Sequence, residues 1–245
     1  MALHTNLVFG LKLDEVSGDR RDYVGNTVGT DVNTVGSTPG KIGNAARFVQ
    51  ANSEQLNFGP ITSLIGGGAA SWAMCGFTRW TAAGGSGDLV ITKDGSSARA
   101  WMVDRSAADT LRFMIFNGIS TGVATRTAAV PTSGWFWWAA YYDKDAGGSG
   151  FGQAGLRINN DAFSTVDCSA TPGVNSSSVR AGYRDLAGGT YLDGDLDLVY
   201  AWRGRVPSNA EFDQVYNGGN GLVIPVPSGH SAARRIVTSI GRRSR

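Results

Sequence analysis

The chain has 245 residues, a formal net charge of +2 and 35 glycines, and this length suits one large β domain or two small ones. The glycines have no three-residue period, which excludes a collagen. No run of 18 apolar residues occurs, so the sequence predicts no transmembrane helix. The N-terminus, MALHTNLVFG, lacks the basic segment and long apolar core of a signal peptide, and we expect none.

The positive charge is concentrated at the C-terminus. Residues 228–245 contain five arginines and no acidic residue. Without these five, 17 of the 22 basic residues remain against 20 acidic ones, which gives the rest of the chain a net charge of −3. We therefore do not expect it to bind nucleic acid through charge. The composition changes after Pro225 and Pro227, so we predict one domain at 1–225 and a basic arm at 226–245.

The cysteines and histidines give little support to metal or triad chemistry. Cys75 and Cys168 are far apart in sequence, and buried free thiols are favoured over a disulfide because a core of this size needs no cross-link. His4 and His230 lie near opposite ends of the chain. A histidine metal site or a Ser-His-Asp triad is therefore poorly supported.

Short apolar runs between glycine-rich turns predict a mainly β protein. The Asn117-Gly118 pair is a strong hairpin signal, and 46–48 is expected to pair with 55–58. In chain order, we expect strands at 7–13, 46–48, 55–58, 72–80, 89–92, 99–103, 111–116, 123–127, 135–142, 156–158, 163–166 and 179–183, with weaker β structure at 27–36.

Residues 135–142, WFWWAAYY, are the most apolar stretch. Both strand faces are aromatic, with Trp135, Trp137 and Tyr141 on one of them, so the strand must be central and covered twice. One interpretation is a core strand with a loop over its second face. The other is an aromatic surface that binds sugar rings or a neighbouring subunit.

Residues 193–200 predict another strand. Leu196, Leu198 and Tyr200 alternate with Asp195 and Asp197, as in a strand with unlike faces.

A short helix should follow that strand. Pro207 is suited to its start, and Ser208 with Glu211 three residues later forms a capping-box pattern. The apolar residues at 212, 215 and 216 give one stripe. Gly218 and Gly219 predict its end.

Several of these segments resemble one family in the same order. They are an acidic-x-x-Ser-Gly and Asp-x-x-Gly pattern at 14–25, a Gly-Lys-x-Gly-x-Ala turn and strand at 40–48, a Trp-x-x-x-Ala strand at 135–143, and the closing strand, Trp and helix at 194–221. This pattern is similar to that of the laminin-G-like, concanavalin A-like jelly-roll superfamily. The chain departs from it at Leu198, where a glutamate is common, and at 159–160, where Asp-Gly or Asn-Gly is usual.

The resemblance implies an all-β fold: a two-sheet antiparallel jelly-roll sandwich with one short helix near the C-terminus. Its sheets are expected to pack face to face about 10 Å apart. The superfamily includes lectins, adhesion modules, glycosidases and virion proteins, so it does not fix the function.

Glucanases of this superfamily place two glutamates on one strand, as nucleophile and acid/base. This chain has only Glu15, Glu54 and Glu211, and no two of them share a strand. The nearest substitute is the aspartate series Asp193, Asp195 and Asp197. We therefore predict that the protein is not an enzyme, and we keep a glycoside hydrolase using these aspartates as the alternative.

The same aspartates have two other interpretations. As oxygen donors at alternate positions, Asp193, Asp195 and Asp197 are candidate Ca²⁺ ligands, and the resemblance also implies calcium at a sheet edge. Alternatively, they face solvent or pair with arginines such as Arg203 and Arg205. For Asp197 we favour a structural hydrogen bond to a turn.

The tryptophans are the candidate sugar-binding residues. A sugar can stack on a tryptophan only if the ring is exposed. The principal candidates are Trp72, Trp101, Trp135 and Trp138, with Trp80 and Trp137 in the same wider set.

The C-terminal arm is the candidate assembly element. Ser231 is a potential helix cap, but so short a helix is marginal in water without a partner. The arm residues are Arg234, Arg235, Ile236, Ile240, Arg242 and Arg243. We expect residues 228–245 to bind a protein partner or a neighbouring subunit; the alternative is a disordered basic tail.

These features predict a non-catalytic, lectin-like structural or recognition module. We expect it to be displayed on a virion, as a phage decoration or fibre protein, or on another large assembly, and to be part of an oligomer. The alternative is a secreted or surface adhesion protein that binds glycans.

Overall fold

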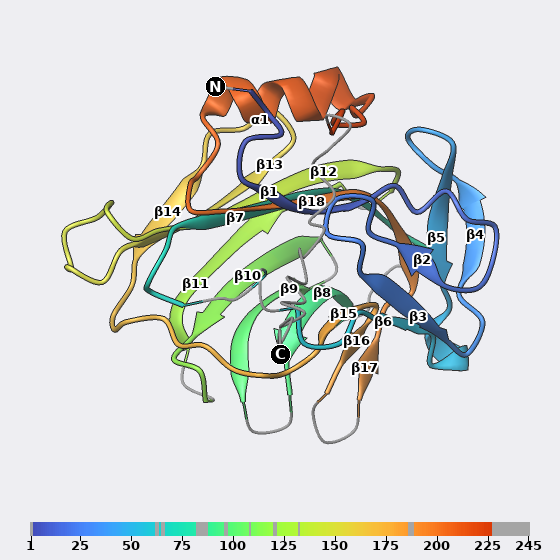
Figure 1. Cartoon of the computed structure of the whole chain (residues 1–245), viewed down its shortest axis with the longest axis horizontal. Coiled ribbons are helices and arrows are strands. Elements are labelled where there is room, and N and C mark those ends of the chain that lie inside the picture. The colour runs from blue at the N-terminus through green and yellow to red at the C-terminus, as the bar shows by residue number, and fades with distance from the viewer. Residues whose placement is uncertain are drawn as a thin grey trace, which may run out of the picture.

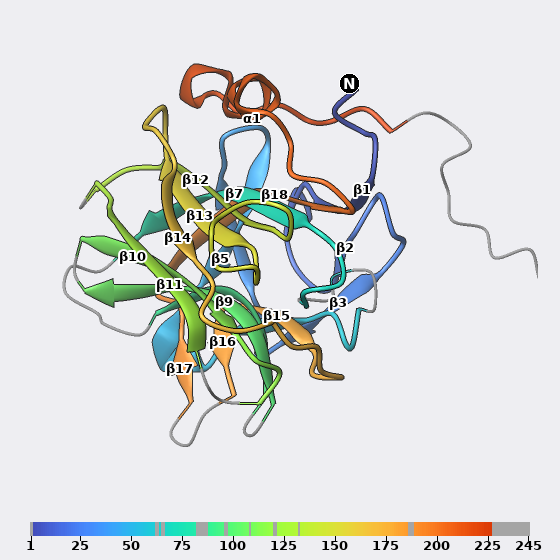
Figure 2. The ribbon, with the colours of Figure 1, turned by 90° about the vertical axis from the view of Figure 1, so that its left-hand side faces the viewer.

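The computed structural model describes residues 2–61, 64, 67–81, 88–95, 98–107, 109–119, 122–131, 133–185 and 189–226. Two antiparallel sheets lie face to face in this part of the chain, with one short α-helix, α1, on the outside of one of them (Figures 1 and 2). The predicted all-β sandwich with one helix near the C-terminus is confirmed. None of the helices in the described ranges is long and apolar enough to cross a membrane.

The first sheet has the strand order β14-β13-β12-β7-β18-β5-β4, and β1 pairs with β18 beside β5. Its strands are β1 (Leu7–Leu11), β4 (Gly36–Pro39), β5 (Asn44–Phe48), β7 (Trp72–Trp80), β12 (Phe136–Asp143), β13 (Gln153–Ile158), β14 (Ser164–Asp167) and β18 (Gly194–Arg203).

The second sheet has the order β11-β10-β9-β8-β15-β6-β3-β2, and a separate hairpin joins β16 and β17. The strands are β2 (Arg20–Arg21), β3 (Val28–Val32), β6 (Gln55–Asn57), β8 (Leu89–Asp94), β9 (Arg99–Ala107), β10 (Thr110–Phe116), β11 (Gly122–Ala129), β15 (Val179–Ala181), β16 (Tyr183–Arg184) and β17 (Thr190–Tyr191). The helical segments are α1 (Asn209–Tyr216) and the 3-10 turns η1 (Gln50–Asn52) and η2 (Asn217–Gly219).

Local sequence signals place most strands correctly, but one predicted pairing is wrong. The strand expected at 72–80 is β7, and β10 pairs with β11 across the predicted hairpin. The segments 46–48 and 55–58, however, do not pair with each other. β5 pairs with β4 and β18 in the first sheet, whereas β6 pairs with β3 and β15 in the second. The 3-10 turn between them carries the chain from one sheet to the other.

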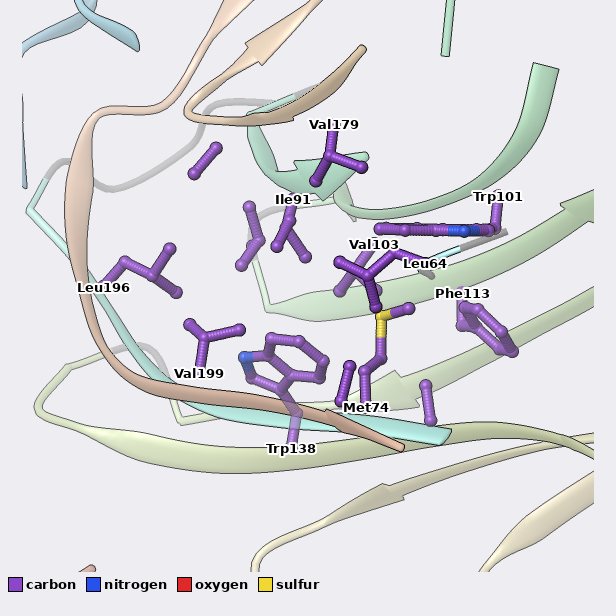
Figure 3. Packing of buried hydrophobic residues seen from close by; sticks show 14 of the residues in the cluster. Leu64, Met74, Ile91, Trp101, Val103, Phe113, Trp138, Val179, Leu196 and Val199 are labelled. Atoms are coloured by element: carbon purple, nitrogen blue, oxygen red, sulfur yellow. The ribbon is translucent and has the colours of Figure 1, made fainter. Parts of the chain in front are cut away.

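A β-bulge in β18 corrects the predicted alternation of that strand. Leu198 has a positive φ of 49°, and the pairing with β7 shifts between Asp197 and Tyr200. Such a bulge inserts an extra residue and reverses which side chains face the core. Leu196 and Val199 therefore both point into the core between the sheets (Figure 3), while Leu198 and Tyr200 lie on the outer face.

The main core fills the space between the sheets. Trp138 and Met74 extend from the first sheet toward Trp101, Val103 and Phe113 of the second (Figure 3). Trp138 also donates its indole N–H to Thr78 Oγ1 at 3.0 Å. Cys75 and Cys168 are both buried and free, as predicted.

Helix α1 covers the outer face of the first sheet and forms a second core there (Figure 1). Phe212 and Tyr216 on the helix pack on Trp137 of β12, with ring centroids 6.0 and 5.6 Å apart. The prediction that β12 is central and covered twice is confirmed, although its second cover here is a helix rather than a loop. The predicted capping box is also present: Ser208 and Glu211 exchange hydrogen bonds at the helix start.

Candidate functional site

The outer face of the first sheet carries a band of aromatic side chains along β12. Trp135, immediately before β12, and Tyr141, near its end, are only partly buried, whereas Trp137 between them is fully covered by α1. Trp135 and Tyr141 are six residues apart, about 20 Å along an extended strand. Helix α1 therefore leaves two separate accessible regions, one at each end of the strand.

At the Tyr141 end, three segments enclose a shallow groove of about 470 Å³. They are the end of β12, the β13–β14 hairpin and the start of α1. Tyr141 and Phe163 form the aromatic part, with ring centroids 4.9 Å apart in an edge-to-face arrangement. The groove lining includes Tyr141, Asp143, Phe163, Pro207, Ser208 and Asn209.

The neighbouring hydrogen bonds hold the groove residues in place. Asp143 Oδ1 accepts from Ser71 Oγ at 3.0 Å and from the Asp145 amide at 3.1 Å. The Tyr141 hydroxyl donates to Gln153 Oε1 at 3.3 Å. Burial, together with the charge of Asp143, raises the pKa of Tyr141 above its usual value, so the hydroxyl keeps its proton at neutral pH.

Beneath the groove, Arg157 ties the hairpin to the helix. Its guanidinium lies 5.9 Å from the ring centroid of Phe163 and pairs with Asp213 of α1. Arg157 is almost fully buried, while Asp213 is half exposed. The bond pins the hairpin to α1 and so positions Phe163 next to Tyr141.

At the Trp135 end, four residues form a row across the sheet, which we call the arginine row: Arg47 of β5, Asp195 of β18, Arg79 of β7 and Trp135. Asp195 is the direct register partner of both Arg47 and Arg79. Phe136 pairs with Thr78, which places Trp135 beside Arg79. The row thus results from the register of three strands that are distant in sequence.

The buried carboxylate of Asp195 holds both arginines of this row. Arg79 Nε donates to Asp195 Oδ2 at 2.7 Å, and Arg47 Nη1 donates to Oδ1 at 3.2 Å. The Arg79 guanidinium carbon lies 4.9 Å from the ring centroid of Trp135, a cation–π contact. Asp195 is fully buried, but the side chains of Arg47 and Arg79 are 35% and 30% exposed.

Asp197 is part of a structural junction, as we favoured from the sequence. Its Oδ2 accepts hydrogen bonds from the amides of Lys41 at 2.6 Å and Ile42 at 3.4 Å. A side chain on Gly40 would meet that carboxylate oxygen at 2.5 Å. Gly43, at φ 69°, takes a conformation that favours glycine. The Gly-Lys-x-Gly turn noted in the sequence therefore wraps around Asp197.

Each of the three aspartates proposed as Ca²⁺ ligands binds protein groups in the structure. Asp195 is bound by arginines, Asp197 by the turn amides, and Asp193 Oδ1 accepts from Thr81 Oγ1. Among the described residues, no group of three or more His, Cys, Asp and Glu side chains could hold a metal ion. Asp195 does pair with arginines, as one interpretation of the sequence expected, but its partners are Arg47 and Arg79, whereas Arg205 binds Glu211.

Two of the three aspartates considered for glycoside hydrolysis are buried in the fold. Asp195 and Asp197 are 0% exposed, so a substrate cannot reach them. Glu54 accepts from the Val49 amide, Glu211 caps α1, and Glu15 accepts from the Arg21 amide. Each of these side chains therefore has a structural role.

Three of the four principal tryptophan candidates are inaccessible. Trp72, Trp101 and Trp138 are 4%, 1% and 0% exposed because they face the opposite sheet across the core. The wider candidates Trp80 and Trp137 are buried as well. Among the six, only Trp135 reaches the surface, where it lies in the arginine row. The arm residues Arg234, Arg235, Ile236, Ile240, Arg242 and Arg243 lie outside the described residues.

The residues that complete both regions were not predicted from the sequence. Tyr141 was assigned to the same strand face as Trp135 and Trp137, but nothing local indicates that Phe163 and Pro207 converge on it. Arg47 and Arg79 lie within predicted strands, yet their meeting at Asp195 depends on inter-strand register. The one signal in the sequence that could have indicated a buried acidic partner is an arginine at an outward position of a predicted central strand.

Comparison with known proteins gives fold-level matches only. No family model and no curated protein sequence matches the chain. Among solved structures, the binding domain of Paraclostridial Mosquitocidal Protein 1 aligns over 89% of this chain and 53% of its own, with a TM-score of 0.68 and 13% identity. The binding domain of Botulinum Neurotoxin DC in complex with SialylT aligns over 88% and 52%, with a TM-score of 0.66 and 11% identity.

A further structure of the Botulinum neurotoxin DC binding domain, in complex with rat synaptotagmin II, aligns over 87% of this chain and 52% of its own, with a TM-score of 0.68 and 11% identity. The chain thus spans about half the length of the structures that it matches. At these identities the likeness shows a shared all-β sandwich fold. The relationship to the laminin-G-like superfamily stays a prediction.

Proposed function

We propose that the protein is a non-catalytic module that binds glycans through the groove beside Tyr141 and Phe163. The observation that carries this proposal is the combination, in one open groove, of two partly exposed aromatic rings with the polar side chains of Asp143 and Asn209. Sugars present apolar C–H faces and many hydroxyls, so a site for them needs both kinds of surface.

Two further observations favour binding over catalysis. The groove contains a single carboxylate, Asp143, whereas glycoside hydrolysis uses a pair. The matched structures are described as receptor-binding or binding domains, two of them in complex with SialylT or synaptotagmin II. Binding of that kind is a property of those proteins; for this chain it adds to the proposal made from the groove.

The test is a glycan array probed with the whole chain, followed by calorimetry with the best neutral oligosaccharide. We expect Tyr141→Ala and Phe163→Ala each to weaken binding about tenfold, because each removes an aromatic surface that contacts the sugar. Tyr141→Phe should retain most of the affinity, since it keeps the ring and removes only the hydroxyl.

Phe151→Ala is the matched control. Phe151 is 42% exposed and does not line the groove, so its loss should leave affinity unchanged. An array without any bound glycan would contradict the proposal. Equal affinities of the wild type, Tyr141→Ala and Phe163→Ala would move the site elsewhere and overturn the assignment to the groove.

We also propose that residues 226–245 attach the module to a larger assembly, a virion or another surface structure. The support is compositional: five arginines, no acid and apolar residues at helical spacing follow the last prolines. Removing residues 228–245 should leave the domain folded and abolish its incorporation into particles. Normal incorporation of the shortened chain would refute this role.

A further inference from the structure

The arginine row has the features of an oxyanion site. Arg47 and Arg79 share one carboxylate, Asp195, whose two oxygens both accept from them. The pair therefore retains one positive charge that Asp195 does not balance. Since Asp195 is buried, it fixes the guanidinium groups from below, while about a third of each arginine side chain is exposed.

The geometry of the row limits how the arginines can move. Three residues hold Arg79: Asp195 contacts its Nε and Nη2, Thr38 Oγ1 accepts from Nη2 at 3.4 Å, and Trp135 makes the cation–π contact. The cross-strand partner of Arg47 on β4 is Gly36. Because Gly36 has no side chain, it leaves Arg47 uncovered on that side. Two pre-oriented guanidinium groups beside an aromatic ring suit a planar anion attached to a ring that has an apolar C–H face.

We propose that the arginine row binds the carboxylate of an acidic saccharide, with the sugar ring against Trp135. The guanidinium groups of Arg47 and Arg79 donate hydrogen bonds to the carboxylate, and Asp195 acts as a positioning residue beneath them. The inference builds on the proposed glycan-binding function but uses a different region, about 20 Å along β12 from the groove.

The surrounding charges are mixed, which argues for a specific rather than a diffuse attraction. The ammonium group of Lys41 lies over the ring of Phe77. Asp193, two residues before Asp195, accepts a hydrogen bond from Thr81. Because these charges offset each other, the affinity must come from direct contacts with the two guanidinium groups. Negative charge without a sugar ring to lie against Trp135 should therefore add little affinity.

The probes are trigalacturonate and 3′-sialyllactose, compared with their neutral counterparts, the methyl ester of trigalacturonate and lactose. Lactose 6′-sulfate tests whether a sulfate oxyanion substitutes for the carboxylate. We expect at least one acidic probe to bind more tightly than its neutral counterpart. Arg47→Gln should reduce that affinity about tenfold, the effect of losing one charge-assisted hydrogen bond. Arg21→Gln, on an exposed arginine of β2, should have no effect.

Two more variants keep the test decisive. Arg79→Lys retains the charge but loses the planar fork, and should also weaken binding of the acidic probe; it serves if Arg47→Gln fails to fold. Tyr141→Ala should leave binding of the acidic probe unchanged, which separates this inference from the groove. Equal binding of acidic and neutral probes, or equal losses in Arg47→Gln and Arg21→Gln, would overturn the inference. Tighter binding of the sulfate alone would overturn its assignment to a carboxylate.

Discussion

Individual buried carboxylates in this protein stabilise turns and strand pairs rather than forming a reactive centre. Asp22 Oδ1 accepts from the amides of Gly10, Val24 and Gly25, and Asp197 does the same for the turn at Lys41 and Ile42. Burial raises the pKa of Asp197 to about 7, despite these backbone hydrogen bonds. Its ionisation in the folded state therefore opposes folding at neutral pH.

This shift predicts a pH dependence that Asp197→Asn removes. The unfolded carboxyl titrates near 3.8 and the folded one near 7, so the folded state binds the extra proton between these values. Stability contributed by the proton is complete below about pH 4 and is lost as the pH rises to about 7. The variant should therefore gain on the wild type across this window, by at most about 4 kcal/mol.

Urea unfolding at several pH values measures this difference. Asp109→Asn, in an exposed turn, is the control, and its stability should follow the wild type at every pH. If the unfolding free energies of Asp197→Asn and the wild type differed by a constant amount from pH 4 to pH 8, the shift of Asp197 would be refuted.

At the scale of elements, helix α1 determines which part of the sheet is accessible. Its start is fixed because Ser208 Oγ accepts from the Glu211 amide and Arg205 donates to both oxygens of Glu211, at 2.8 and 2.9 Å. The same end of the helix forms one wall of the groove. Helix capping and groove shape are therefore linked.

Ser208→Ala should lower the free energy of unfolding by about 1 kcal/mol, since it removes the side-chain cap. It should also weaken binding of the neutral oligosaccharide, because Ser208 and Asn209 line the groove. Chemical denaturation and calorimetry measure the two effects. Ser37→Ala, an exposed serine of β4, is the control; equal stability of the two variants would exclude the capping role.

Elements were predictable from the sequence where the signal was local. The helix start was predicted correctly from Pro207, Ser208 and Glu211. The hairpin between β10 and β11 was predicted correctly from Asn117-Gly118. The bulge at Leu198 was not, because a leucine at positive φ is rare. Its side chain is buried and lies close to Gly221. Without the bulge, the inward and outward faces of β18 are misassigned.

For the whole molecule, the fold was predictable but the accessible sites were not. Strands with alternating faces, and one strand that is apolar on both faces, predict a two-sheet sandwich. The order of the motifs predicts the jelly-roll type of sandwich. Neither indicates which tryptophans face the core: Trp138 and Trp101 do, while Trp135 lies just before the start of β12 and is not covered by the helix. The groove depends on Tyr141 and Phe163, which are 22 residues apart, and the arginine row on Arg47 and Asp195, which are 148 apart. Both contacts are set by the topology of the sheets.

The central claim is that ligands bind to the outer face of the first sheet, at the two regions that α1 leaves uncovered. The most direct measurement is the change in NMR chemical shifts of the isotopically labelled chain on titration with a neutral oligosaccharide and with 3′-sialyllactose. The neutral ligand should shift signals of Tyr141, Phe163 and Asn209. The acidic ligand should instead shift signals of Arg47, Arg79 and the indole N–H of Trp135. Shifts confined to the second sheet, or none with either ligand, would contradict the account.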